Sequence, residues 1–336
     1  MNAQRVATRP KWAAALQRQR GVAVVTALLL TTLAITIVAS LFWQQQVQVR
    51  SIENQRLQLQ KQWILRGALD WSRLILREDA RYSTVDHLGE PWAVTLAETR
   101  LDQYVENTGA SGEIADAALS GGIVDAQSRL NLTNLAQGGQ INPVEVAAFA
   151  RLLTSLRLNP SLAQATATTM AAGQTKTATA SSSSTSSTSS TSSTSTSSSL
   201  GQSSPQPLGI TQIDDLLAVP GFTPVMLAKL QDFVVVLPRA TPINVNTAPA
   251  EVLSARIDTL PLSQATALVA MRDKAYFKDT ADFAQRAGVS GAGQISVMTN
   301  YFLVNGNVRL NRAGMRMQSL IERNGLSTQV IWIREN

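Results

Sequence analysis

The sequence contains no cysteine and a single histidine, His87. Without cysteine there are no disulfides and no thiolate metal sites, although this absence does not fix the cellular compartment. A single histidine also rules out a metal site built from several imidazoles. His87 lies in the turn-like stretch DHLGEP, and we interpret it as an exposed loop residue.

A second absence is that of charge between Val22 and Trp43. As a helix, these 22 residues would be roughly 33 Å long, and the hydrocarbon core of a bilayer is about 30 Å thick. Proline is also absent from Val22 to Glu90, so one helix can continue past the apolar run. The segment is therefore long enough to cross a membrane.

The basic residues before this run explain most of the net charge of +6. The first 21 residues contain no acidic side chain, and the rest of the chain is nearly neutral. Lysine and arginine next to a membrane span stay on the cytoplasmic side, which predicts a cytoplasmic N-terminus and a body on the other side. A nearly neutral body gives no electrostatic reason to expect nucleic acid. The basic residues before the run are Arg5, Arg9, Lys11, Arg18 and Arg20.

Three interpretations of the apolar segment remain open from its residues alone. A secretory signal peptide has a shorter apolar centre, about 7–15 residues, and would be cleaved near Val38-Ala39-Ser40. A plain signal anchor would stay uncleaved. The third interpretation depends on Gly21, between the basic stretch and the apolar run, because glycine lets an extended backbone approach a membrane peptidase closely.

The junction Arg20-Gly21-Val22 resembles the cleavage site of type IV prepilins and pseudopilins. The resemblance implies cleavage after Gly21 by prepilin peptidase and methylation of the new N-terminus at Val22. Such proteins usually have glutamate at the fifth mature position, where this chain has Thr26. A buried carboxylate without a partner is costly, so a subunit with no neighbour beyond it is better without one. An uncharged fifth position is similar to the minor pseudopilin K family of type II secretion systems.

Residues 44–80 continue as an amphipathic, glutamine-rich helix. Within it, QLQKQWILRGALDW resembles the family's helix segment that enters the globular domain. Strand-type segments follow, and then Gly121 and Gly122 precede Asp125 and the alternating stretch around Asn131. This resembles a family pattern of a glycine pair, an aspartate and an NLN-like segment. Asp125 and Asn131 suit a cation, but capping or turn roles are favoured.

Helical sequence begins at Ile141, with Asn142 and Pro143 placed as cap and first turn. Residues 181–199 are all serine or threonine, and such a tract does not bury enough apolar surface to fold. We therefore expect residues 161–207 to be a disordered loop acting as a tether. The acidic segment that family members often have here is absent, so the sequence does not support carrying calcium binding over from the family, and no cofactor is expected.

Residues 210–293 indicate several short helices, among them the segment INVNTAPAEVL. It closely resembles the signature of the family's helical insert, which is similar to SAM-like and helix-hairpin-helix modules. Thr247 is expected as the N-cap of one helix, with Pro249 in its first turn. The residues that carry this resemblance are Asn244, Asn246, Thr247 and Pro249.

A helix-hairpin-helix resemblance raises DNA binding as an alternative function. A DNA-binding hairpin has glycine on both sides of an apolar residue, so that backbone amides reach phosphate. Here Gly221-Phe222-Thr223 has only the first glycine, and the surrounding charges are mixed. We expect a protein-interaction module and no nucleic acid partner, with a membrane-anchored DNA-uptake or adhesion module as the alternative.

The C-terminal residues 294–336 return to strand-type sequence, with turn signals at Asn305-Gly306 and Asn324-Gly325. The predicted fold class is therefore α+β and pilin-like: a long transmembrane helix, a domain with an antiparallel sheet, and a large helical insert. The boundaries are a cleaved leader at 1–21, a membrane half of the helix at 22–43, and its continuation at 44–80. The pilin-like domain takes 81–140 and 294–336, and the insert takes 141–293.

The resemblance implies a non-enzymatic role as a minor pseudopilin that caps the pseudopilus and helps to initiate its assembly for protein export. It implies a single pass through the bacterial inner membrane, with the body in the periplasm. The implied partners are minor pseudopilins I and J, the major pseudopilin and prepilin peptidase. Adjacent carboxylates such as Asp214 and Asp215 do not share a helix face and give no reason to expect an enzyme.

Overall fold

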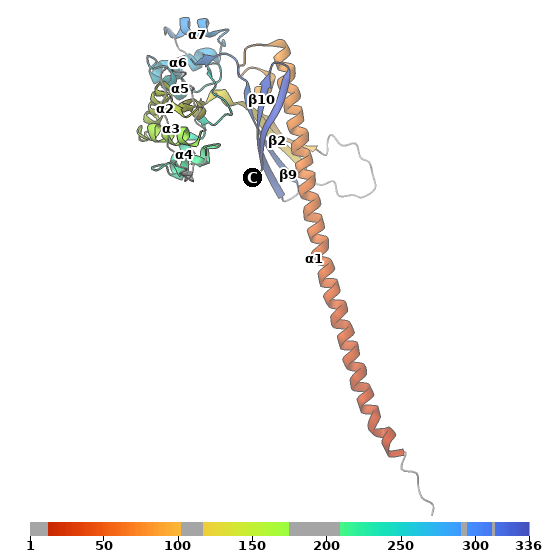
Figure 1. Cartoon of the computed structure of the whole chain (residues 1–336). Coiled ribbons are helices and arrows are strands. Elements are labelled where there is room, and N and C mark those ends of the chain that lie inside the picture. The colour runs from red at the N-terminus through yellow and green to blue at the C-terminus, as the bar shows by residue number, and fades with distance from the viewer. Residues whose placement is uncertain (1–12, 102–116, 175–208, 290–293, 311–312, 336) are drawn as a thin grey trace, which may run out of the picture. The chain divides into compact units, whose positions relative to one another are not determined.

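The computed structural model describes residues 13–101, 117–174, 209–289, 294–310 and 313–335 (Figure 1). Its first element, α1 (Ala13–Tyr82), is a single helix of 70 residues, which confirms the prediction of an unbroken helix after the apolar run. The chain divides into two compact units, one up to Trp63 and one from Ile64 onward. The second unit contains its own cores and is described below.

The main element of the second unit is a five-stranded antiparallel sheet in the order β1-β2-β9-β10-β11. Strands β9 and β10 form a hairpin, and β10 and β11 form the next one. This sheet confirms the α+β class and the antiparallel sheet that the sequence predicts. Its strands are β1 (Leu96–Arg100), β2 (Ala117–Asp125), β9 (Tyr301–Leu310), β10 (Ala313–Asn324) and β11 (Ser327–Glu335).

The C-terminal part of α1 lies on one face of this sheet (Figure 1). Leu65, Leu69 and Leu76 are at helical spacing and pack with apolar side chains of β2, β9 and β10. Trp92, from the 3₁₀ helix Pro91–Ala93, packs edge-on against Phe302 with 5.2 Å between ring centroids. The apolar side of the amphipathic half of α1 thus packs on one face of the sheet.

A helical block is inserted between two neighbouring strands. Strand β2 pairs directly with β9, with Asp125 opposite Phe302, although these two residues are 177 positions apart in the sequence. The block's helices are α2 (Pro143–Ser155), α3 (Leu162–Gly173), α4 (Pro224–Leu230), α5 (Ala250–Arg256), α6 (Leu262–Arg272) and α7 (Thr280–Ala287).

Short pairs of strands tie the block's segments together. The parallel pairs are β3 (Leu130–Asn131) with β6 (Val234–Val235), and β7 (Ile243–Asn244) with β8 (Ile295–Ser296). The antiparallel pair is β4 (Ala136–Gln137) with β5 (Gln140–Ile141). Among the described residues, the 3₁₀ helices between β2 and β9 are Ala126–Ser128, Leu132–Leu135 and Ile213–Ala218.

The block has two apolar cores. One is formed chiefly by α2, α3, α4 and the segment around Leu132, and the other by α5, α6 and α7. Helix α2 begins at Pro143 after Asn142, whose side chain accepts from the Val144 N–H, as the sequence predicts. The helical insert is therefore a folded body with its own apolar interior.

The expectation of a disordered loop from residue 161 is wrong at its start, because Leu162–Gly173 form helix α3. Leu162, Ala167 and Met170 are buried in the first core of the block. Alanine and threonine are small enough to pack closely on α2, so this stretch folds although its composition resembles the tract that follows it. Residues 175–208 lie outside the described residues.

The structure also moves the boundary of the insert, which the sequence places at Ile141. The sheet ends at Asp125 on β2, and Leu130, Leu132 and Leu135 already belong to the first core of the helical block. On the other side, β8 pairs with β7 of the block, and the sheet resumes only at Tyr301. The alternation of Leu and Asn resembles a strand of the sheet, but these leucines face the helices.

Of the two predicted Asn-Gly turns, one is confirmed and one is wrong. Gly325, with φ of 56°, is in the loop that joins β10 to β11. Asn305 and Gly306 instead lie inside β9, opposite Gln318 and Met317 of β10. A residue pair that suits a turn is accommodated inside a strand here, because Leu65 of α1 packs above Gly306.

Candidate functional site

The first candidate surface is the apolar half of α1. From Gly21 to Trp43 every side chain is exposed, including Val22 at 65% and Trp43 at 76%. Within the described residues this is the one helix long and apolar enough to cross a membrane. Such a surface is stable in water only when lipid or other apolar helices cover it.

The threonine hydroxyls of this half form hydrogen bonds within the helix itself. The hydroxyl of Thr26 donates to the carbonyl oxygens of Val22 and Ala23, each at 3.0 Å. Thr31, Thr32 and Thr36 make the same kind of bond to carbonyls three residues earlier. Gly21 and Val22 both lie within α1, and cleavage between them stays a prediction.

A second site is the polar junction between the sheet and the helical block, with Asp125 at its centre. Asp125 is the last residue of β2 and is buried. One carboxylate oxygen accepts from the Gln127 N–H at 2.7 Å and the Thr299 hydroxyl at 2.6 Å. The other accepts from Asn244 Nδ2 at 2.9 Å and the Thr247 hydroxyl at 2.5 Å. The single side chain thus joins three distant segments.

Burial raises the pKa of Asp125 to about 6, because an apolar environment disfavours the charged form. The hydroxyls of Thr247 and Thr299 oppose this shift by donating to the carboxylate, whereas the nearby charge of Asp86 adds to it. At neutral pH Asp125 is therefore an ionised, buried acceptor held by four donors. This arrangement links chain segments and is not an exposed reactive group.

Asn131 has a similar linking role, and the predicted capping roles of Asp125 and Asn131 are confirmed. Asn131 caps the 3₁₀ helix Leu132–Leu135 and accepts from the N–H of Thr133 and of Leu237, each at 3.1 Å. Its amide donates to the Arg239 carbonyl at 2.8 Å. Among the described residues Asp125 and Asn131 share no hydrogen-bond partner, so the structure does not unite them as one set of ligands.

The INVNTAPAEVL segment is buried and supplies structural bonds. Asn246 accepts from the Phe277 N–H at 2.8 Å and donates to its carbonyl at 2.9 Å. Thr247 is not the predicted N-cap, because its hydroxyl is used by Asp125. Pro249 is the residue that precedes α5, so it occupies the cap position and lies just outside the first turn.

The glycine pair on β2 has two different roles. A side chain on Gly121 would clash with the backbone carbonyl of Asn305 on the neighbouring β9. On Gly122 a Cβ would meet only Thr95, at an ordinary 3.6 Å. Gly121 is therefore required by the close approach of two strands, whereas Gly122 is not.

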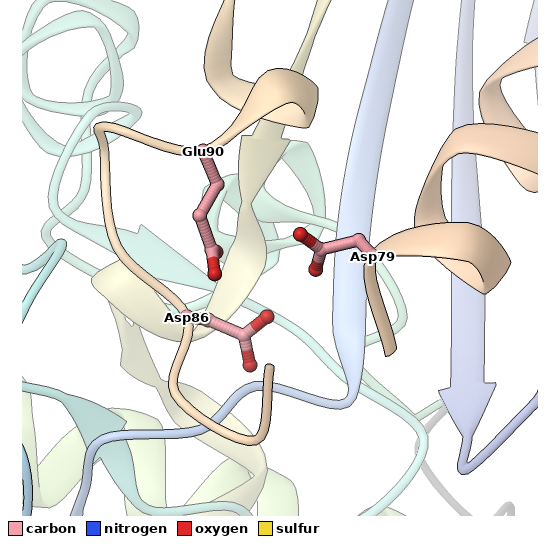
Figure 2. Close-up of side chains that lie close together, drawn as sticks. All are labelled: Asp79, Asp86 and Glu90. Atoms are coloured by element: carbon pink, nitrogen blue, oxygen red, sulfur yellow. The ribbon is translucent and has the colours of Figure 1, made fainter. Parts of the chain in front are cut away.

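A cluster of three buried carboxylates adjoins the junction, and sequence reasoning missed it. Figure 2 shows Asp79, near the end of α1, and Asp86 and Glu90, in the loop that follows, with carboxylates directed toward one another. Arg323 of β10 forms an ion pair with Asp79 at 2.9 Å and a second one with Asp86. Glu90 instead accepts from the Trp92 indole N–H at 2.7 Å.

Burial and the neighbouring charge of Glu90 raise the pKa of Asp79 to about 6, while Arg323 opposes the shift. Burial also raises the pKa of Asp86, again against Arg323 and against the Thr299 N–H. Three carboxylates within 4.8 Å of one another are donors of the kind that a hard cation prefers. Here the guanidinium of Arg323 already provides positive charge to two of them, so the arrangement serves as a structural ion cluster.

The cluster leaves little trace in the sequence. Its three acids lie at a helix end and in a turn, where acidic residues are common, and Arg323 is more than 200 residues away. His87, in the same turn, is half-buried and stacks on Tyr276 of the helical block with 4.1 Å between ring centroids. The interpretation of His87 as an exposed loop residue is therefore wrong.

The hairpin considered for DNA binding is built for packing. Gly221 has φ of 103°, Phe222 is buried in the first core, and Thr223 caps α4. A Cβ on Gly221 would crowd Leu162 of α3 at 2.8 Å. The glycine thus serves the turn and its contact with α3.

An exposed apolar helix half, an amphipathic half covering an antiparallel sheet, and a helical block inserted in that sheet define a pilin-like subunit with a membrane-type anchor. Two family models, both described as type II secretion system (T2SS), protein K, match residues 128–239 and 243–305. A relative from Pseudomonas aeruginosa strain PAO1, the type II secretion system protein K, is 29% identical over 318 residues, covering 91% of this chain and 89% of the relative.

The fold agrees with these sequence matches. A solved structure, the GspK–GspI–GspJ complex of the enterotoxigenic Escherichia coli type 2 secretion system, contains a chain with a TM-score of 0.61 at 20% identity. The match covers 85% of this chain and 99% of that one. The chain belongs to the protein K family of type II secretion systems. The expected family resemblance and the pilin-like fold are thereby confirmed.

Proposed function

We propose that the protein is a non-enzymatic minor pseudopilin that caps the tip of the pseudopilus and helps to start its assembly. The observation that carries this proposal is the fully exposed apolar half of α1, continuous with the helix that covers the sheet. A helix of this kind serves both as a membrane anchor before assembly and as a packing surface within a filament.

Membership of the protein K family and the fold neighbour suggest the partners. The related solved chain is in a complex with GspI and GspJ. We infer that this chain joins their counterparts through its apolar helix, and that the major pseudopilin packs below. Helices that are already associated reduce the entropic cost of adding the next subunit, which is how such a complex would start a filament.

Two features support a position at the tip. Thr26 stands where pilin-like subunits usually have a glutamate, and its hydroxyl is satisfied within α1. The insert between β2 and β9 adds a second folded body to the sheet domain, which any subunit stacked beyond it would have to accommodate. A subunit at the tip has no neighbour beyond it, so it needs neither a glutamate to pair with that neighbour nor room for it above the insert.

The orientation follows from charge. The basic residues before Gly21 favour a cytoplasmic N-terminus, which places the folded body in the periplasm of a bacterium. Cleavage by prepilin peptidase between Gly21 and Val22 would then leave the apolar helix at the new N-terminus. The leader is needed for insertion and not for the filament.

Mass spectrometry of the N-terminus of protein from native membranes, with and without prepilin peptidase, tests the proposal. A methylated Val22 that is lost without the peptidase is the expected result. An uncleaved N-terminus would indicate a simple anchored protein, and a start at Leu41 would indicate a secreted one. Either of these results would exclude assembly into a pseudopilus.

A further inference from the structure

Arg272, the last residue of α6, is a buried cation that lacks a full set of partners. Its side chain is 6% exposed, and one terminal nitrogen donates to the carbonyls of Val245, at 2.8 Å, and of Ala248. Its Nε is buried and has no hydrogen-bond partner among the described residues. The carboxylate of Asp273 lies 4.0 Å from this Nε and is itself 62% exposed.

This arrangement leaves positive charge poorly compensated inside the protein. Arginine keeps its proton in proteins, so the group does not escape the cost by becoming neutral. Burial lowers the pKa of Arg272, and Asp273 offsets this only in part. Buried charges are normally paired, so additional negative charge beside this guanidinium is favourable.

A cavity of about 290 Å³ lies beside this guanidinium, between the helical block and the loop that follows α1. Lys274 lines it as a second cation. The stacked rings of His87 and Tyr276 also line it, and they are nearly parallel, with 10° between their planes. The Gly89 N–H donates to His87 Nδ1 at 3.1 Å, which fixes the orientation of the imidazole ring.

The charges of the lining set the class of ligand. The lining contains two cations, Arg272 and Lys274, and one carboxylate, Asp273. Its net charge is therefore positive, which favours a ligand with negative charge. The cavity lies at the lower limit of the roughly 300–1,000 Å³ of ordinary ligand pockets, which favours a small ligand. Guanidinium groups recognise carboxylates and phosphates by paired, charge-assisted hydrogen bonds.

We propose that this pocket binds a small oxyanion, a carboxylate or a phosphate, through Arg272 and Lys274. The anion places further negative charge beside a guanidinium whose neighbouring carboxylate, Asp273, is largely exposed. Because His87 follows α1 while Arg272, Lys274 and Tyr276 belong to the block, the bound anion also strengthens the attachment of the block to the pilin-like part.

The test uses the purified full chain in detergent, titrated with sodium phosphate or sodium acetate at constant ionic strength set by chloride. The midpoint of thermal unfolding and calorimetric binding are both measured. Ligand that binds only the folded state raises the midpoint with concentration. Tighter binding of phosphate identifies a phosphate site, and tighter binding of acetate identifies a carboxylate site. No effect of either beyond that of chloride overturns the proposal.

Variants separate a built site from a general salt effect. Lys274→Ala should weaken anion binding about tenfold, and Asp273→Asn should strengthen it severalfold, because each changes the charge at the pocket. Lys278→Ala is the matched control, since Lys278 is exposed and does not line the pocket. Equal affinities in all three variants would overturn the proposal without requiring any change to the buried Arg272.

Discussion

Asp125 shows how one buried side chain determines both geometry and pH response. Its raised pKa means that the folded state binds the proton more tightly than the unfolded chain does. The resulting contribution to stability is complete below the unfolded pKa of 3.8 and is lost as pH rises through about 6. Asp79 contributes with the same sign.

The variant Asp125→Asn tests this. It should be less stable than the wild type, because an amide group cannot accept from all four donors. Between about pH 4 and pH 7 the wild-type advantage should shrink by at most about 3 kcal/mol, since one pKa unit is worth about 1.4 kcal/mol. Urea unfolding at several pH values measures both effects, with exposed Asp214→Asn as control. A wild-type advantage that grows with pH would contradict the assignment.

The proposed position at the tip depends in part on Thr26, an uncharged residue where pilin-like subunits usually have a glutamate. Thr26→Glu places a carboxylate in the apolar half of α1, where it has no partner at a tip, so secretion of a reporter substrate should fall. Thr26→Val is the control and should behave like wild type, because the hydroxyl bonds only within the helix. Unchanged secretion with the glutamate would refute the charge-avoidance account.

At the scale of the strand, the two adjacent glycines of β2 differ sharply in what they tolerate. Gly121→Ala should destabilise the protein by at least about 2 kcal/mol, because its Cβ would overlap the Asn305 carbonyl and push β2 from β9. Gly122→Ala should change stability by less than about 1 kcal/mol. Thermal and urea unfolding of the two purified variants measure the difference, and equal effects would show that the strands can separate without cost.

The described residues on either side of the serine and threonine tract belong to one core. Met170 of α3 and Ile210 after the tract belong to the same core. The Gly173 carbonyl lies 3.9 Å from where a Cβ on Gly209 would be, so the two ends of the intervening segment meet. The described residues that flank 175–208 therefore lie close together.

Replacing residues 175–208 by about four glycine and serine residues should accordingly stabilise the chain by about 2 kcal/mol. Each halving of a flexible loop recovers about 0.6 kcal/mol of closure entropy, and this change is about three halvings. A scrambled tract of the same length is the control and should leave the unfolding midpoint unchanged. Destabilisation by the short loop would show that the tract itself contributes contacts.

For the whole molecule, the division at Trp63 predicts that folding of the body and assembly through the apolar helix can be separated. Residues 64–336 contain the sheet and the apolar cores, so this fragment should fold alone as a monomer that needs no detergent. Circular dichroism, size exclusion and a cooperative unfolding transition would verify this. The fragment should fail to restore secretion, since it lacks the apolar half of α1. An aggregated or unfolded fragment would mean that the first half is required for folding.

The sequence by itself determined the features that depend on local composition. The apolar run, the missing charge at Thr26, the glycine pair and the Asn142 cap are readable because hydrophobicity, charge and backbone freedom act over a few residues. Together with the resemblance of the Gly21–Val22 junction and of INVNTAPAEVL to known pseudopilins, they led to the prediction of a pilin-like α+β chain of the protein K family. They did not suffice to predict α3, because its small residues resemble the polar tract that follows and are stabilised only by packing on α2.

Only the tertiary structure decided which distant residues meet. Strand β9 pairs with β2 rather than turning at Asn305-Gly306, because Gly121 and Gly306 let the strands and Leu65 approach. The bonds of Asp125, the ion cluster around Arg323 and the cavity beside Arg272 all join segments tens to hundreds of residues apart. The energies of buried charges depend on such neighbours and on the exclusion of water, and neither is written in local sequence.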